Sequence, residues 1–145
     1  MKKFRFRLEK ALKMREWAEG EAKIELGRAV GELSALEKSV KANALARNAA
    51  GERRFTGGDA LNMVYENYLA RLESEKEALL KKTAEAESKV EAARTVWTDA
   101  KAALKTMENL KERRFKEYRK DALAEEEKQL EEARRSDADC SGDAD

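Results

Sequence analysis

The chain has 145 residues, of which 42% are charged, and its formal net charge is +1. Interleaved charge of both signs in a chain of single-domain length is typical of a long solvated helix or coiled coil, and it argues against a globule with a dense core. The sequence has no Pro, the strongest helix breaker, and no His, the commonest general base and metal ligand near neutral pH.

Residues 3–50 are predicted to form a first helix. Apolar side chains in it alternate steps of four and three, the heptad spacing of a coiled-coil seam, at Ala22, Leu26, Ala29, Leu33, Leu36 and Val40. Upstream, the stripe continues through Phe4, Leu8, Ala11, Met14 and Ala18, with a drift in phase near Ala18 that resembles a stutter. Three glycines, Gly20, Gly27 and Gly31, interrupt the helix, each at a cost of about 1 kcal/mol of helix propensity. We expect close packing against a second helix to offset that cost, and a flexible section is the alternative.

Residues 51–59 form the predicted loop, because its three glycines permit turn conformations. Asp59 is the expected N-cap of a second helix over residues 60–135. The predicted seam of that helix keeps the heptad alternation and comprises Leu61, Tyr65, Tyr68, Leu72, Glu75, Leu79, Lys82, Ala86, Lys89, Ala93, Val96, Ala100, Ala103, Met107 and Leu110. Three of these residues are charged and weaken the seam. Residues 136–145 are rich in Asp and are expected to form a disordered acidic tail.

A short connection predicts that the two helices pack antiparallel. The fold class is therefore all-α, a single domain built as a long two-helix antiparallel coiled-coil hairpin. A turn near residue 55 would place residue i opposite about 110 minus i, leaving the C-terminal part of the second helix as an overhang. Self-association of the heptads between copies is the alternative arrangement.

Two basic runs meet at one end of this hairpin, in residues 2–15 and 111–120. Phe115 and Tyr118 lie within the second run, on the overhang. Exposed aromatic residues on an unpaired helix indicate a partner surface, whereas packing against Phe4 and Phe6 is the alternative. A basic surface suits an acidic protein, an acidic membrane or nucleic acid. The low net charge and the lack of a base-reading motif argue against nucleic acid.

No catalytic signature is present: the sequence has no phosphate-binding GxxxxGK[ST], no cluster of metal ligands and no nucleophile beside a base. We expect neither enzymatic activity nor a cofactor. The single cysteine, Cys140, has no partner for an intrachain disulfide. No apolar run approaches the ~18 residues that span a bilayer, and charge interrupts the N-terminus where a signal peptide needs an apolar core. We therefore predict a cytoplasmic protein without direct membrane insertion.

Two stretches of the chain resemble a known family. FRFRLEKALKMREWAEGEAKIELGRA near the N-terminus and LKERRFKEYRKDALAEEEKQLEE near the C-terminus, joined through the central hinge, resemble the flagellar type III export protein FliJ over residues 2–132. The most specific parts are F-x-F-x-L-x-K-x-L-x-x-R-E and K-E-R-R-x-x-E-Y. The acidic tail lies outside the family pattern and is assigned no role.

The resemblance implies a coiled coil similar to the central stalk of rotary ATPases. Such a protein binds the hexameric export ATPase, promotes its assembly and activity, and links it to the export gate membrane protein and to export chaperones. It is cytoplasmic and peripherally associated with the inner membrane export apparatus. A generic structural or self-associating coiled coil is the alternative function.

Two sets of candidate residues follow from the resemblance. The end facing the ATPase would comprise Arg5, Arg7, Lys13, Arg15, Arg113, Arg114, Phe115, Tyr118 and Arg119. The loop-proximal half would face the export gate, through Leu36, Val40, Tyr65, Tyr68 and Leu72. The second assignment rests on family geometry alone, and each of its residues is equally well explained as part of the seam.

Overall fold

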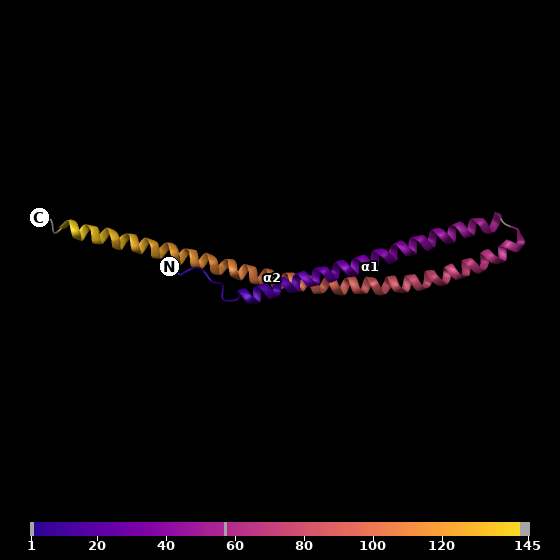
Figure 1. Cartoon of the computed structure of the whole chain (residues 1–145), viewed down its shortest axis with the longest axis horizontal. Helices are drawn as coiled ribbons and strands as arrows, with labels where there is room; N and C mark the ends of the chain where they lie inside the picture. The colour runs from indigo at the N-terminus through magenta and orange to yellow at the C-terminus, as the bar shows by residue number, and fades with distance from the viewer. Residues whose placement is uncertain (1, 57, 143–145) are drawn as a thin grey trace. The chain divides into compact units, whose positions relative to one another are not determined.

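The protein is an all-α hairpin in the computed structural model, which describes residues 2–56 and 58–142, apart from the side chains of residues 55, 56, 59 and 60. Helix α1 spans Glu9–Thr56 and helix α2 spans Asp59–Gly142. The two helices lie side by side, joined at their loop-proximal ends (Figure 1). No strand occurs among the described residues. The predicted fold class is confirmed.

Contacts divide the chain into two compact units. The terminal unit combines Met1–Trp17 with Lys101–Asp145, and the hairpin unit is Ala18–Ala100. Each unit contains a piece of both helices, so each has an interhelical seam of its own.

The N-terminal segment, residues 2–8, is not helical, although helix was predicted from residue 3. α1 begins only at Glu9. Within the segment Phe4 and Phe6 are half-buried, and the basic residues beside them are exposed. This alternation has the period of two of an extended chain and places both rings on one side. The prediction was wrong because it followed the four-residue spacing of Phe4, Leu8 and Leu12 and ignored the shorter period. Met14 and Ala18, which were predicted to continue the stripe, are exposed.

The break between the helices is much shorter than the predicted loop 51–59, because α1 continues through Thr56 and α2 begins at Asp59. A single glycine at position 51 costs the helix only about 1 kcal/mol. Arg53 and Arg54 in the last turn of α1 offset part of this cost, because positive charge near the C-terminus of a helix stabilises it. At the start of α2, the backbone carbonyl of Gly58 accepts hydrogen bonds from the N–H groups of residues 61 and 62, at 3.0 and 3.2 Å. The Asp59 side chain, predicted to cap α2, lies outside the described side chains.

The C-terminal tail also differs from its prediction. Helix was expected to end near residue 135 and to be followed by a disordered segment, but α2 continues through Gly142. Every backbone hydrogen bond of a helix is local, so α2 can extend from its packed part where neither Pro nor Gly interrupts it. No such breaker occurs between Asp59 and Gly142. Residues 143–145 of the predicted tail lie outside the described residues.

The seam of α1 follows the predicted heptads, since all six predicted residues between 22 and 40 are buried or half-buried. Between Tyr68 and Val96 the seam of α2 is rotated by one residue at every second position. The exposed Tyr68, Glu75, Lys82, Lys89 and Val96 give way to buried or half-buried neighbours, which are Leu69, Lys76, Thr83, Val90 and Trp97. The charged residues that seemed to interrupt the seam therefore point away from it. Beyond this stretch Ala100, Ala103, Met107 and Leu110 are half-buried as predicted, whereas Leu61, at the start of α2, is exposed.

The core between the helices is thin. Its buried apolar side chains are Leu12, Ala22, Ala29, Ala50, Leu72, Ala86 and Val90, and no large side chain in the described part of the chain is fully buried. Four of these seven are alanines, which bury little area each. The few larger residues therefore contribute disproportionately to the stability of the hairpin.

Polar contacts define how the helices are aligned in the hairpin unit. Asn43, the one buried polar residue among those described, donates from Nδ2 to the Leu72 carbonyl at 3.0 Å and accepts from Arg47 Nε at 3.0 Å. Trp97 Nε1 donates to Glu19 at 3.0 Å. The residue numbers of these two interhelical pairs sum to 115 and 116. The predicted sum of about 110 was too low because the helices turn after Thr56 and not near residue 55.

The three interior glycines do not pack closely. A Cβ atom built at Gly20, Gly27 or Gly31 would meet no other heavy atom within 4 Å, apart from its own helix backbone and chain neighbours. The expectation that these glycines allow a close approach of the helices is therefore wrong. They leave open space on α1 and weaken its helix propensity without compensation from packing.

Replacing Gly27 or Gly31 by alanine is expected to raise the free energy of unfolding by about 1 kcal/mol each, because alanine fits the open space and favours the helix. Urea denaturation followed by circular dichroism measures the change. Unchanged or lowered stability in both variants would contradict the view that these positions are unpacked.

Candidate functional site

The N-terminal segment lies against α2 in the terminal unit through a cluster of aromatic rings (Figure 1). The Phe4 ring centroid lies 5.2 Å from that of Phe115, edge to face, and 5.4 Å from that of Tyr118. The Tyr118 hydroxyl donates to the backbone carbonyl of Lys2 at 2.7 Å. Aromatic pairs of this geometry contribute about 0.5–1.5 kcal/mol each beyond their buried area. The cluster thus attaches the first residues of the chain to a helix more than a hundred residues away.

Charged contacts surround this aromatic cluster. Lys111 Nζ lies 3.0 Å from a carboxylate oxygen of Glu9, at the first turn of α1. The guanidinium of Arg119 lies over the Phe115 ring, 6.0 Å from its centroid. Both contacts are partly exposed, so each contributes no more than about 1 kcal/mol. The Lys111–Glu9 pair aligns the start of α1 with the second basic run, whereas the Arg119–Phe115 contact lies within α2.

These contacts gather basic and aromatic side chains in the terminal unit, and we call residues 2–15 and 111–120 of that unit the basic end. All nine predicted ATPase-facing residues lie in this terminal unit. Tyr118 is half-buried, and the other eight side chains are exposed: Arg5, Arg7, Lys13, Arg15, Arg113, Arg114, Phe115 and Arg119. Residues 2–15 contain seven basic residues against one acidic residue, and residues 111–120 contain six against two. Such a concentration of one sign attracts an acidic partner and speeds its association.

The aromatic residues of the second run therefore pack against the chain's own N-terminus, which was one of the two alternatives for them. Phe115 nevertheless remains 41% exposed. A hollow of about 500 Å³ beside it is lined by Phe4, Leu12, Glu16, Glu108, Lys111, Glu112 and Phe115. The basic end thus offers apolar area beside its charges, which is the composition of a protein-binding surface.

The predicted gate-facing residues lie in the hairpin unit and differ in exposure. Leu36, Val40 and Tyr65 are half-buried, while Tyr68 is exposed with the Arg71 guanidinium 5.9 Å from its ring centroid. Leu72 is only 5% exposed and belongs to the core. Tyr68 is thus the member of this set best placed to contact another protein, and Leu72 supports the seam beneath it.

Three exposed apolar residues near the connection of the helices were not among the predicted site residues: Leu45, Met63 and Val64. They stand off the seam, at outward positions that a coiled coil normally fills with polar residues. That departure from the heptad pattern was the available signal. These residues add apolar surface to the loop-proximal part of the hairpin unit.

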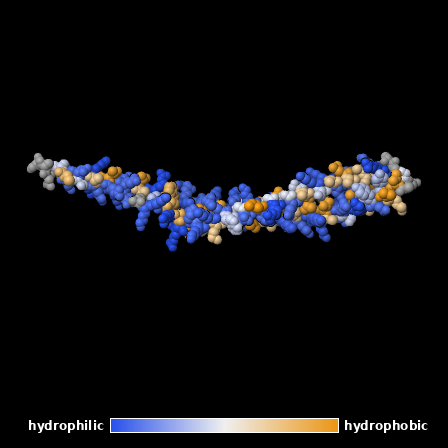
Figure 2. Space-filling view, in the orientation of Figure 1, coloured by the Kyte–Doolittle hydropathy of each residue, from blue (hydrophilic) through white to orange (hydrophobic). Residues whose placement is uncertain are grey.

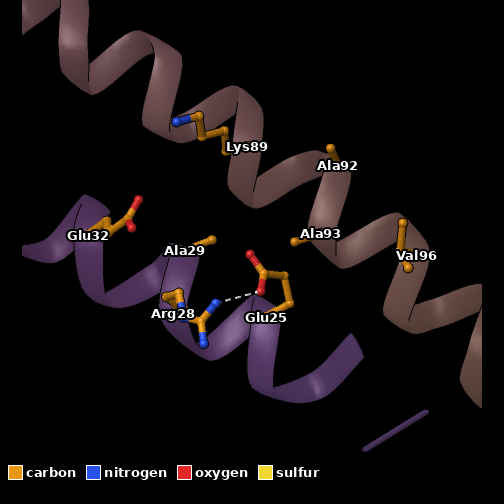
Figure 3. A pocket seen from close by; sticks show the side chains of 8 residues that line it. All are labelled: Glu25, Arg28, Ala29, Glu32, Lys89, Ala92, Ala93 and Val96. Atoms are coloured by element: carbon orange, nitrogen blue, oxygen red, sulfur yellow. Dashed lines mark hydrogen bonds and ion pairs between the residues drawn. The ribbon is translucent and has the colours of Figure 1, made fainter. Parts of the chain in front are cut away.

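A second hollow, of about 400 Å³, lies between the helices of the hairpin unit (Figure 3). Ala29 of α1 and Ala93 of α2 face it, and Arg28 pairs with Glu25 at its edge at 3.1 Å. The small side chains leave this space because they are too short to fill the seam. We assign it no chemistry.

Over the described residues, no group of three or more acidic or cysteine side chains is arranged to hold a metal ion. Neither helix contains, in its described part, a stretch long and apolar enough to cross a membrane.

Comparison with protein families gives one match. The family model described as "Flagellar FliJ protein" matches residues 4–136. The match includes most of the N-terminal segment, most of the first basic run and all of the second. Comparisons with curated proteins and with solved structures found no match.

Proposed function

The chain belongs to the flagellar FliJ protein family, which serves flagellum assembly and type III protein export, and we propose that it acts there as a stalk-like coiled coil that binds the export ATPase. In this proposal the basic end inserts into the hexameric ATPase ring and promotes its assembly and ATP turnover. The protein works without a cofactor, on the cytoplasmic side, peripherally associated with the inner membrane export apparatus.

One observation carries this proposal. The aromatic cluster of Phe4, Phe115 and Tyr118 draws basic runs from opposite ends of the chain onto one surface of the terminal unit. A coiled coil that serves only as a spacer needs no such concentration of charge, whereas docking to an acidic protein surface benefits from it. The exposed Phe115 ring supplies the apolar contact that gives such a surface affinity.

Charge reversal at Arg113 and Arg114 tests this assignment. Both side chains are exposed, so Arg113→Glu/Arg114→Glu is expected to leave the fold intact. It should weaken stimulation of a cognate export ATPase by about tenfold or more, because two favourable charges become repulsive. The measurement is ATP turnover and ring assembly as a function of the concentration of this protein, at low and raised salt.

The matched control is Lys81→Glu/Lys82→Glu, which makes the same change of charge at exposed positions of the hairpin unit. It should stimulate the ATPase as wild type does. The assignment fails if the arginine variant, folded by circular dichroism, stimulates as well as this control.

The loop-proximal half is proposed to contact the export gate membrane protein, through Tyr68 together with Leu36, Val40 and Tyr65. Tyr68 supports this proposal because it is an exposed aromatic side chain held by Arg71 beside the apolar residues near the connection. Export chaperones are further proposed partners, on the family relationship alone.

A further inference from the structure

The C-terminal part of α2, which we call the acidic arm, comprises residues 121–142. From residue 123 onward every side chain of the arm is exposed in the described structure. Leu123 and Leu130 are 59% and 62% exposed. They stand seven residues apart, so they share one face of the helix. Hydrophilic residues dominate the surface of this part of α2 (Figure 2), and the two leucines form its apolar stripe.

Charge on α2 changes sign where the arm begins. Residues 111–120 contain six basic residues against two acidic, whereas residues 121–142 contain eight acidic against three basic. The arm therefore carries, on the same helix, a surface complementary in charge to the run that precedes it. A straight helix cannot fold back on itself, so the arm cannot pair with the basic run of its own chain.

We infer that the acidic arm pairs with a second copy of this chain, antiparallel, with each arm lying along the basic run of the other copy. Two-fold symmetry then sets each acidic arm opposite the basic run of the other copy, so that the same attraction occurs twice in one interface. A parallel pair is disfavoured, because it would set acidic arm against acidic arm and basic run against basic run. The most acidic stretch of the arm, residues 124–133, contains five acidic residues against one basic. Setting this stretch opposite residues 111–120 of the other copy places the axis near Ala122, so that Leu123 lies close to its copy.

The interface is narrow, with few apolar side chains on each copy, so the dimer is weak and its formation depends on concentration. Because opposite charges supply much of the attraction, raised salt dissociates it. The dimer occupies the basic end at Arg113, Arg114 and Arg119. If the proposed function holds, ATPase binding and dimer formation therefore exclude each other, a consequence that rests on that function.

Sedimentation of the full chain, with reductant present, tests the inference without any ATPase. We expect the mean mass to rise from one chain toward two over about a hundredfold range of concentration at low salt, and to return to one chain at high salt. Leu123→Glu, which sets two like charges at the axis, should raise the dimer dissociation constant by about tenfold or more. Leu45→Glu alters a leucine that is 70% exposed in the hairpin unit and should behave as wild type.

The native Cys140, exposed on the arm, serves as the site for a spin label that reports orientation. An antiparallel pair with its axis near Leu123 separates the two labels by about 50 Å, whereas a parallel pair brings them within about 20 Å, at the helical rise of 1.5 Å per residue. A monomer at every concentration, a dimer indifferent to Leu123→Glu, or the short label distance would each overturn the inference. Any of these results leaves ATPase binding by the single chain as a separate question.

Discussion

Replacing Leu72 by alanine is expected to lower the free energy of unfolding by about 2–4 kcal/mol, the largest loss that we expect from one apolar truncation in the hairpin unit. Leu72 is 5% exposed and is one of two leucines in the buried core. Much of the remaining core is alanine, which cannot reach into the cavity that the truncation leaves. The backbone carbonyl of Leu72 also accepts the hydrogen bond from Asn43, so a shift of α2 at this position would disturb the alignment of the two helices.

Urea denaturation followed by circular dichroism measures this loss. Leu80→Ala is the matched control, because Leu80 lies on the same helix but is exposed, and we expect it to cost less than about 1 kcal/mol. Equal losses in the two variants would mean that the seam of α2 does not run through Leu72. Leu72 belongs to the seam of α2 in both the predicted and the observed rotation, so a second pair of variants distinguishes the two rotations. Val90 is buried and Val96 is exposed, so Val90→Ala should lower the free energy of unfolding more than Val96→Ala does.

Phe4→Ala is expected to release the N-terminal segment from α2 while leaving both helices folded. The truncation removes two ring pairs and the apolar area under them, in total about 2–3 kcal/mol, which raises the population of the released segment by about 30-fold to 150-fold. Trypsin should therefore cleave after Arg5 and Arg7 faster by a similar factor. Limited proteolysis read by mass spectrometry follows these two sites.

Phe6→Ala is the comparison variant, since it removes a ring of equal size from the same segment but leaves the Phe4 pairs in place. It should accelerate cleavage less than Phe4→Ala does. Cleavage of Phe4→Ala at the wild-type rate would show that the aromatic cluster does not hold the segment. If the basic end binds the ATPase as proposed, Phe4→Ala should also weaken stimulation, because Arg5 and Arg7 lose their fixed position.

The heptad pattern predicted the two helices and the α1 seam, but it left the rotation of α2 ambiguous. Two overlapping stripes on α2 share every seventh residue, including Leu72 and Ala86. Between these shared residues, each member of one stripe is the sequence neighbour of a member of the other stripe. One stripe includes Tyr68 and Val96, the other Leu69 and Val90. Both are rich enough in apolar residues to qualify, and the charged residues in the first were the evidence against it. Only packing against α1 selects between them.

Element ends were predicted less well, because they depend on small differences in free energy. Gly51 costs the helix about 1 kcal/mol, and α1 continues through it for about one and a half turns to Thr56, because extending a formed helix is far easier than starting one. The N-terminal segment was missed for another reason: its extended form is stabilised by Phe115 and Tyr118, which lie far along the sequence. The hydrogen bond from Tyr118 to the Lys2 carbonyl involves a backbone atom, and no side-chain pattern announces it.

The prediction of the basic end depended less on the rotation of the seam than the prediction of the gate-facing set did. Charge runs are read directly from the sequence, and an antiparallel hairpin brings the two runs into one unit whatever the rotation of the seam. The gate-facing set depended on that rotation, and so it combined the buried Leu72 with the exposed Tyr68.

The central claim is that the basic end, and not the connection between the helices, faces the export ATPase. A photo-crosslinking amino acid placed at Arg114 or at Met63, both exposed, tests this most directly when the full chain is mixed with the cognate ATPase. We predict efficient crosslinks to the ATPase from position 114 and none above background from position 63. Crosslinks from position 63 alone, or equally from both positions, would contradict the claim.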